Sequence, residues 1–329
     1  MNYRAVGCTI VALALSSAAH HVLAQAPKDA AASYPSRPIR LIVPVAPGGS
    51  SDGMARILGQ KLTDSWNQQV LVDNRPGASE IIGTDLVAKG VPDGQTIVLV
   101  SLRFSVNPSL LKLPYDSVKD FEPVSMTAAV GNVLVVNVKS PIMSVKDLIA
   151  AAKQKPGELV FASSGLGGAP HLVGEFFALT TGVKLTHVAY KGGGPAVADL
   201  LGGNVAMSFA SMTSALQFVK AGRLRALAVS SKERSALLPD VPTMAEAGVP
   251  GVEVSSWSAF FVPARTPQDI VRKIGSDTVA ALAEPAVREK LEQGGIVVIG
   301  STPDELASFL NSEMDRWGRI IKAANIRAQ

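Results

Sequence analysis

Two glycine-rich turns carry the residues of this chain that are best suited to binding chemistry. The first lies between the apolar run Ile39–Val45 and a helical pattern, and it contains Pro47, Gly48, Gly49, Ser50 and Asp52. The second follows Val160–Ala162 and contains Ser163, Ser164, Gly165 and His171. A helix that starts directly after such a turn presents free backbone N–H groups, which attract anions. Either turn alone is most often only a tight connection, but together they predict two lobes that grip one small acidic molecule.

The elements around the first turn predict an α/β fold. A helix is expected to start near Ser51, and further apolar strands are expected at Val70–Val72 and Thr96–Val100. Strands that alternate with helices at this spacing favour βαβ units and mainly parallel sheets. Ligands of such sheets bind beyond the carboxyl ends of the strands. We therefore expect the loops at Pro47–Asp52, Gly77–Glu80 and Ser101–Asn107 to share one edge.

The second half of the chain predicts another α/β unit. Two apolar runs, Pro123–Thr127 and Val133–Val136, read as separate strands, and the second unit opens at Leu159–Ala162. The chain is expected to leave its first domain near Ala128 and to return near Pro250. This divides it into a discontinuous first domain, residues 27–128 with 250–329, and a second domain, residues 129–249.

Residues 1–26 have the pattern of a secretory signal peptide. Arg4 precedes an uncharged stretch from Ala5 to Ala19, and small residues near Ala24 and Ala26 offer a cleavage site. An uncleaved membrane anchor is the alternative, but the stretch is short for a stable span. The pattern predicts export to the periplasm. Cys8 lies inside the apolar stretch and is not a lipidation site.

Composition excludes several function classes. The chain has 31 basic and 27 acidic residues without basic blocks, which makes nucleic acid an unexpected partner. Its one cysteine lies in the leader, so neither a disulfide framework nor a cysteine metal site is expected, and no cofactor is implied. Ser163 or Ser164 with His171 is the one Ser–His combination near a glycine turn. Their separation of about two helical turns argues against a hydrolase.

Several sequence blocks resemble the Bug-type extracytoplasmic receptors of tripartite tricarboxylate transporters. The resemblance covers essentially the whole mature chain. It rests on blocks that occur in the family's order, namely Tyr34–Arg40, Pro47–Asp52, Asn74–Ala78, Leu113–Asp116, Ala162–Gly165, His171, Tyr190–Gly192, Leu224–Val229, Leu238–Thr243 and Arg316–Gly318.

The resemblance implies a two-lobed, Venus-flytrap periplasmic-binding-protein fold with a small carboxylate in the cleft between α/β domains. Backbone amides, hydroxyls and water would hold the carboxylate, without an arginine clamp. Besides the two glycine turns, the matching positions are Gly77, Ala78, Tyr190, Lys191 and Gly192. Lys191 either faces the cleft or is an exposed turn lysine. His187 is expected to be a packed or exposed strand residue rather than a ligand. The expected partners of this monomer are the membrane subunits of a transporter, or a sensor kinase if the receptor signals instead.

Two departures from the family pattern bear on the ligand. Where the family has two glycines, this chain has Ser79 and Glu80, and Glu80 is either a solvated residue at a helix start or a contact for a ligand ammonium or amide. After the third strand stand Ser101, Leu102, Arg103 and Phe104. Arg103 either pairs bidentately with a ligand carboxylate or is a surface arginine or one tied to an internal Asp. Di- and tricarboxylates and aromatic acids are the candidate ligands.

Overall fold

The computed structural model describes residues 30–324 and 326, and the signal peptide expected at residues 1–26 lies outside them. Ten strands form one continuous, twisted arrangement in the order β2-β1-β3-β9-β4-β7-β5-β6, with β10 and β8 also paired to β4. The strands are β1 (Ile39–Val43), β2 (Val70–Asn74), β3 (Thr96–Ser101), β4 (Phe121–Asn137), β5 (Val160–Ser163), β6 (Thr186–Ala189), β7 (Met207–Ser211), β8 (Leu224–Val229), β9 (Ser255–Pro263) and β10 (Ile296–Val298).

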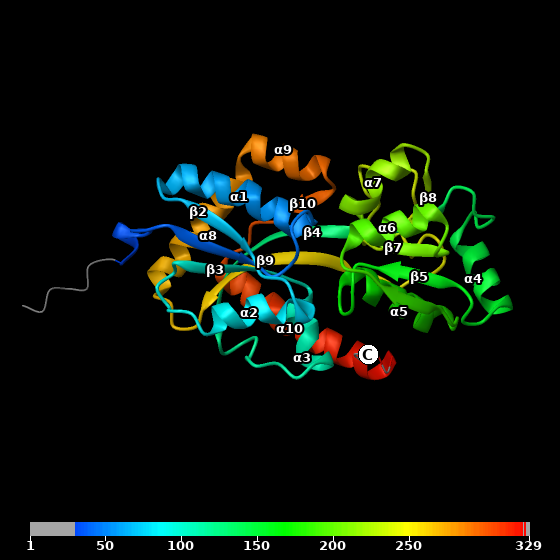
Figure 1. Ribbon diagram of the computed structural model, residues 1–329, viewed down its shortest axis with the longest axis horizontal. Helices are drawn as coiled ribbons and strands as arrows, with labels where there is room; N and C mark the ends of the chain where they lie inside the picture. Colours follow the sequence, from blue (N-terminus) through cyan, green and yellow to red (C-terminus); the bar gives the residue numbers. More distant parts are fainter. Residues whose placement is uncertain (1–29, 325, 327–329) are drawn as a thin grey trace, which may run out of the picture.

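Strand β4 divides this arrangement into two sheets. Its first part, Phe121–Gly131, pairs with β9, and its last part, Asn132–Asn137, pairs with β7 and β8. We call the part with β1, β2, β3, β9 and β10 the first sheet, and the part with β5 to β8 the second sheet. Figure 1 shows the first sheet on the left, in blue and cyan with yellow β9, and the second sheet in green on the right.

The sheets are mixed rather than mainly parallel. Strands β1–β3 and β5–β7 form parallel pairs, whereas β4 is antiparallel to all of its partners and β9 is antiparallel to β3. The reason is that β4 carries the chain out of the first sheet and β9 carries it back. The two strands expected at Pro123–Thr127 and Val133–Val136 are parts of β4, because Ala128, Ala129 and Gly131 between them continue the pairing with β9.

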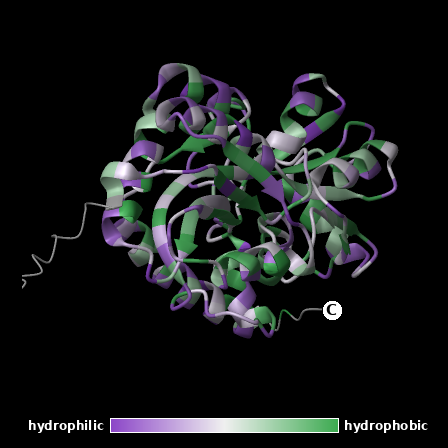
Figure 2. Ribbon diagram, turned by 60° about the vertical axis from the view of Figure 1, so that its left-hand side comes forward, coloured by the Kyte–Doolittle hydropathy of each residue, from purple (hydrophilic) through white to green (hydrophobic). Residues whose placement is uncertain are grey.

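Helices cover both faces of the sheets. The helices are α1 (Ser50–Trp66), α2 (Ile81–Ala88), α3 (Arg103–Leu110), α4 (Val145–Gln154), α5 (Ala169–Thr181), α6 (Gly193–Gly202), α7 (Met212–Lys220), α8 (Gln268–Ala283), α9 (Pro285–Gln293) and α10 (Pro303–Ala324), with short 3-10 turns η1 (Ala30–Ser33) and η2 (Ala78–Glu80). One hydrophobic core lies under α1, α6, α7, α8 and α9, and the other under α2, α3, α4, α5 and α10. In Figure 2 the central strands are mostly hydrophobic, and hydrophilic segments gather on outer helices and loops.

The parallel strands of both sheets end at the place where β4 changes partners. In the first sheet, Ser101 at the end of β3 pairs with Ser258, near the last pair of β4 with β9, Gly131 with Ser255. In the second sheet, Ser211 at the end of β7 pairs with Asn132. We call this place the junction. Because strands β1, β2, β5 and β6 run parallel to these neighbours, the turns that follow them also face the junction.

Candidate ligand-binding site at the junction

The first glycine turn is held by Asp52. Helix α1 begins at Ser50 as expected, and its N-cap residue, Gly49, supplies no side-chain hydrogen bond to the helix start. The buried carboxylate of Asp52 accepts from Gly48 N at 2.9 Å, from Asn74 Nδ2 at 3.0 Å and from Arg56 Nη2 at 2.9 Å. These bonds bring the pKa of Asp52 below its usual value, although burial of the carboxyl acts against them. Asp52 therefore shapes the turn, while Pro47, Gly48 and Gly49 remain exposed.

The second turn, η2, has a left-handed backbone without glycine. Ala78, Ser79 and Glu80 have φ angles of 45°, 54° and 77°, and each such residue costs about 1–2 kcal/mol. Two side chains hold the turn: Asn107 Nδ2 donates to Ser79 O at 2.9 Å, and Thr84 Oγ1 donates to Glu80 O at 2.8 Å. The turn buries the side chain of Glu80 to 7% exposure, so Glu80 is not the solvated residue that its place before a helix indicated.

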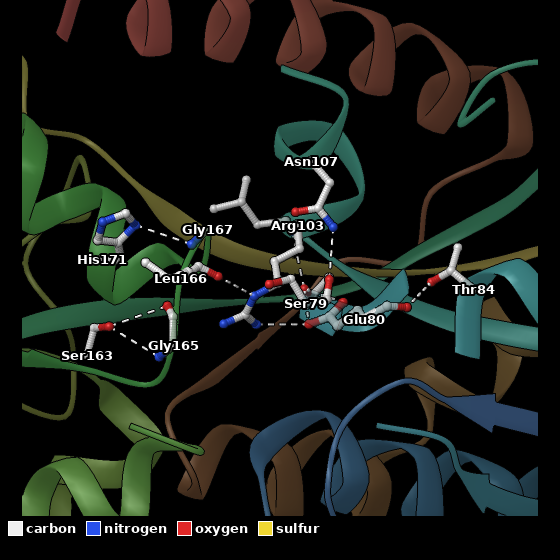
Figure 3. Close-up of polar contacts among 12 residues, drawn as sticks. Ser79, Glu80, Thr84, Arg103, Asn107, Ser163, Gly165, Leu166, Gly167 and His171 are labelled. Carbon is white, nitrogen blue, oxygen red and sulfur yellow. Dashed lines mark hydrogen bonds and ion pairs between the residues drawn. The ribbon is translucent and has the colours of Figure 1, made fainter. Parts of the chain in front are cut away.

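Ser101–Asn107 was expected to be a loop, but α3 begins within it at Arg103. Arg103 Nη1 lies 2.9 Å from Glu80 Oε1, and Ser101 Oγ lies 2.8 Å from both carboxylate oxygens of Glu80. Arg103 Nε also donates to the carbonyl oxygen of Leu166 at 3.0 Å, and Leu166 belongs to the glycine turn of the second sheet (Figure 3). Arg103 is thus tied to an internal acid, and that acid is Glu80 rather than the aspartate expected from the sequence.

The close contact between α3 and the second glycine turn depends on Gly168. A Cβ on Gly168 would lie 2.6 Å from Arg103 Nη2, and a Cβ on Gly167 would lie 3.5 Å from Asn107 Oδ1. Arg103 and Asn107 are four residues apart and therefore share one face of α3. This face lies against the glycine turn, so the two sheets are in contact beside the junction.

Within the second glycine turn, Ser163 and His171 are buried rather than exposed to the junction. Ser163 Oγ lies 2.6 Å from His187 Nε2, so the Ser–His contact is with His187 and not with His171. His171 Nδ1 accepts from Gly167 N at 3.2 Å, and the rings of His171 and His187 stack with centroids 4.2 Å apart. Ser164 and Gly165 are partly exposed. His187 packs, as expected, and the histidine stack supports the turn from behind.

The buried histidine stack predicts a pH dependence of stability. Burial lowers the pKa of His171 to about 3, with further lowering by His187 and Arg103, and burial lowers the pKa of His187 to about 4. The unfolded chain, with histidine pKa values near 6.5, binds more protons between these limits, so the stack's contribution is present above about pH 6.5 and is lost toward about pH 4. Glu175, whose pKa is raised by burial, acts in the opposite direction only near and above its unfolded value of 4.5.

Urea unfolding between about pH 7.5 and pH 5 measures this effect, because ordinary carboxylates stay ionised there. We expect the free energy of unfolding to fall as the pH is lowered, and the slope to be smaller in His187→Phe, which keeps an aromatic ring in the stack. Equal slopes in the two proteins would contradict the assignment to the histidines.

The turn after β6 contains the other residues that were expected to bind the ligand from this side, Tyr190, Lys191 and Gly192. Gly192 is the N-cap residue of α6 and makes no side-chain cap, while Lys191 is exposed. Tyr190 is held by two bonds: its N–H donates to Ser163 O at 3.0 Å, and its hydroxyl donates to Asp199. The bond to Asp199 is the main reason why the pKa of Tyr190 rises to about 12. Tyr190 thus joins the turn after β6 to the turn after β5.

Sequence reasoning missed three features of the junction. Helix α7 begins after Ser211, whose hydroxyl lies 3.0 Å from Thr213 Oγ1 and 2.7 Å from Ser214 Oγ. The signal was present, since Ser211–Ser214 supplies N-cap residue types directly after an apolar strand. The carbonyl of Leu166 and the amide of Asn107 are the other two. Neither has a signal in the sequence, because each contact joins segments far apart in the chain.

Around the junction, the described residues offer helix starts and hydroxyls. Helices α1, α5 and α6 all begin at glycine N-caps without side-chain hydrogen bonds. Among the described residues, no group of three or more His, Cys, Asp or Glu side chains is placed to hold a metal ion. In the same part of the chain, no helix is both long and apolar enough to cross a membrane. This arrangement suits noncovalent binding of an anion.

Comparisons with known proteins agree with this geometry. The chain is 43% identical over 293 residues to BugT of Bordetella pertussis, covering 88% of this chain and 90% of that protein. It is similar to Rpa4515 of R. palustris, whose structure is described with adipate, at 35% identity and a TM-score of 0.85, covering 89% and 99% of the two chains. It is also similar to MatC from Rhodopseudomonas palustris with bound malate, at 28% identity and a TM-score of 0.82, covering 88% and 100%.

A family comparison matches residues 54–326, nearly all of the described chain, to the tripartite tricarboxylate transporter family receptors. The match extends from within α1 to the end of α10, so it includes the second sheet, most of the first sheet and the turns at the junction that follow α1, while β1 and the first glycine turn precede it. It confirms the resemblance found in the sequence, and the fold is the α/β periplasmic-binding-protein fold of these receptors. The chain therefore belongs to the TctC/Bug family of periplasmic solute receptors, which are binding proteins and not enzymes.

Proposed function

We propose that this protein captures a small carboxylate between its two sheets and delivers it to the membrane subunits of a tripartite tricarboxylate transporter. One observation carries the proposal. Helices α1, α5 and α6, whose starts have no side-chain cap, follow directly after the carboxyl ends of parallel strands in both sheets. Each helix start favours a nearby anion by about 0.3–1 kcal/mol when exposed and by up to about 2 kcal/mol when partly buried. Three starts together contribute up to about 6 kcal/mol, and charged hydrogen bonds of about 1.5–3 kcal/mol each from the N–H and hydroxyl groups of the turns bring the total to the roughly 8 kcal/mol of a micromolar affinity.

The proposed binding residues are those of the turns at the junction. From the first sheet they are Pro47, Gly48, Gly49, Ser50, Gly77, Ala78 and Ser79, with Asp52 holding the first turn. From the second sheet they are Ser164, Gly165, Lys191 and Gly192, with Ser163, His171 and Tyr190 behind them. Ser101, Glu80 and Arg103 complete the site as one hydrogen-bonded group. Ser211 joins the list because it ends β7 at the junction.

The two sheets correspond to two proposed domains, residues 27–128 with 250–329 and residues 129–249. The strand partners change between Gly131 and Asn132, and Val254 N still donates to Ser230 O of the second sheet at 3.1 Å. These contacts favour moving the proposed boundaries by a few residues, to Gly131 and to Val254. Closure of the receptor would then bend the chain at these two crossings.

The ligand class is inferred from the site and from relatives. Structures of two relatives contain adipate and malate, which are small carboxylates. We include aromatic acids because Leu102 and Phe104 follow β3 directly, although both are buried and reach the site only through the position of α3. Export by the peptide at residues 1–26 and action as a monomer complete the proposal.

A thermal-shift screen of residues 27–329 tests this function. The panel contains mono-, di- and tricarboxylates, aromatic acids, amino acids, and the primary amides of the same acids. A ligand at 100 times its Kd adds about 2.7 kcal/mol to the stability of the native state. We expect a clear rise of the melting temperature with one class of acid and none with the matching amides. A folded protein that no acid stabilises, and from which denaturation releases no bound acid detectable by mass spectrometry, would contradict the proposal.

A further inference from the structure

The junction contains a carboxylate of its own. Glu80 and Arg103 form an ion pair of 2.9 Å with side-chain exposures of 7% and 14%, which places both charges largely out of water. Ser101 Oγ, 2.8 Å from both oxygens of Glu80, completes the group. In Figure 3 the pair lies between η2, α3 and the glycine turn of the second sheet. The protein thus brings an acid to the place where its proposed ligand is also an acid.

The backbone that positions this carboxylate has a conformation that residues other than glycine rarely adopt. Glu80 has a φ angle of 77°, which glycine adopts readily and other residues adopt with strain. Asn107 and Thr84 bond to the carbonyl oxygens of Ser79 and Glu80 and so maintain the turn. A strained conformation that neighbouring groups enforce is a frequent feature of ligand sites.

The guanidinium of Arg103 is committed to the protein. Nη1 bonds to Glu80 and Nε bonds to Leu166 O, while Nη2 lies against Gly168 so closely that a Cβ there would be 2.6 Å away. The other arginines near the turns are paired as well, Arg56 with Asp52 and Arg75 with Asp73. Lys191 is fully available, but it is exposed, and an exposed pair contributes little.

We propose that this receptor selects acids with a single carboxylate and a neutral far end. The inference rests on the proposed function and narrows its ligand class. The helix starts bind one carboxylate. A second carboxylate beside α3 would meet Glu80, a like charge, and would find Arg103 already neutralised. Enclosing a second charge without a partner is strongly unfavourable, and the ion pair therefore acts as a filter against diacids.

The test compares acids that differ by one carboxylate. The probes are hexanoate with adipate and benzoate with terephthalate, measured by titration calorimetry on the chain from residue 27, together with homologous pairs from four to eight carbons. In the wild-type protein we expect the bound monoacid to exceed its diacid in affinity by at least about tenfold. In Glu80→Gln, which keeps the size of the side chain and frees the charge of Arg103, we expect the diacid to gain at least about tenfold and the monoacid to change by less than about threefold.

Two further proteins make the result decisive. Glu80→Gly removes the carboxylate and suits the positive φ, so it replaces Glu80→Gln if that variant folds poorly. Asp93→Asn is the matched control, because Asp93 pairs with Arg37 in an exposed ion pair of 2.6 Å, and it should change neither affinity. Diacid binding equal to or tighter than monoacid binding in the wild type, or an unchanged ratio in both Glu80 variants, would overturn the filter. Absence of binding by every acid would instead overturn the proposed function, and the filter with it.

Discussion

Replacing Arg103 by Met is expected to lower the free energy of unfolding by about 3–5 kcal/mol near neutral pH. The variant keeps an unbranched side chain of similar length but leaves the Glu80 carboxylate, 7% exposed, with the hydroxyl of Ser101 as its remaining side-chain partner. A buried charge that loses its counter-charge is far more destabilising than the pair was stabilising. Denaturant unfolding followed by circular dichroism measures the effect.

A second substitution that restores stability and a control at an exposed ion pair test whether the unpaired Glu80 carboxylate causes the loss. Adding Glu80→Gly to Arg103→Met removes the unpaired carboxylate together with the strain of the positive φ, and we expect the double variant to return to within about 1 kcal/mol of the wild type. Arg37→Met breaks an ion pair whose side chains are 64% and 35% exposed, and it should cost no more than about 1 kcal/mol. If Arg103→Met were no worse than Arg37→Met, the Glu80–Arg103 pair would not be the buried ion pair described above.

Replacing Gly168 by Val is expected to weaken binding of the preferred acid by roughly 10–150-fold, the equivalent of losing one charged hydrogen bond of about 1.5–3 kcal/mol. Gly168 has φ −78° and ψ 160°, which valine adopts without strain. The new Cβ would lie 2.6 Å from Arg103 Nη2 and 3.0 Å from Cζ. It therefore displaces the guanidinium from Leu166 O and separates α3 from the glycine turn.

The effect should appear in affinity rather than in folding. Titration calorimetry gives the affinity, and the melting temperature without ligand shows whether the variant is folded. Gly53→Val is the control, because Gly53 also lies in the first turn of a helix, at the start of α1, and a Cβ there has nothing within 4 Å. Unchanged affinity in Gly168→Val would show that the contact between α3 and the glycine turn has no part in closure.

Local backbone chemistry explains which parts of the fold were readable in the sequence. The start of α1 after Gly49 follows from residues adjacent in the chain. Helix α3 was missed because its N-cap, Leu102, makes no side-chain bond and Pro108 lies inside it. Strand β4 was divided in two because only its pairing with β9, more than a hundred residues later, shows that the small residues belong to it.

The site also was predicted where it depends on neighbouring residues and was missed where it depends on contacts between distant segments. The glycine turns and their place at the carboxyl ends of strands were predicted, because both depend on local pattern and on sheet topology. The pairing of Glu80 with Arg103 was not, because it requires a left-handed backbone at Ala78–Glu80 that non-glycine residues rarely adopt. The contact of Arg103 with Leu166 joins the two sheets and has no local signature.

The central claim is that the junction recognises a carboxylate through helix starts, and titration calorimetry of one acid and its primary amide tests it most directly. The two ligands have nearly the same shape and differ in charge. The acid with the largest thermal shift should bind with a Kd on the order of micromolar, and its amide at least about 100-fold more weakly, since the helix starts and hydroxyls favour the anion. Equal affinities for acid and amide would contradict the account, because recognition would then depend on shape and not on the carboxylate.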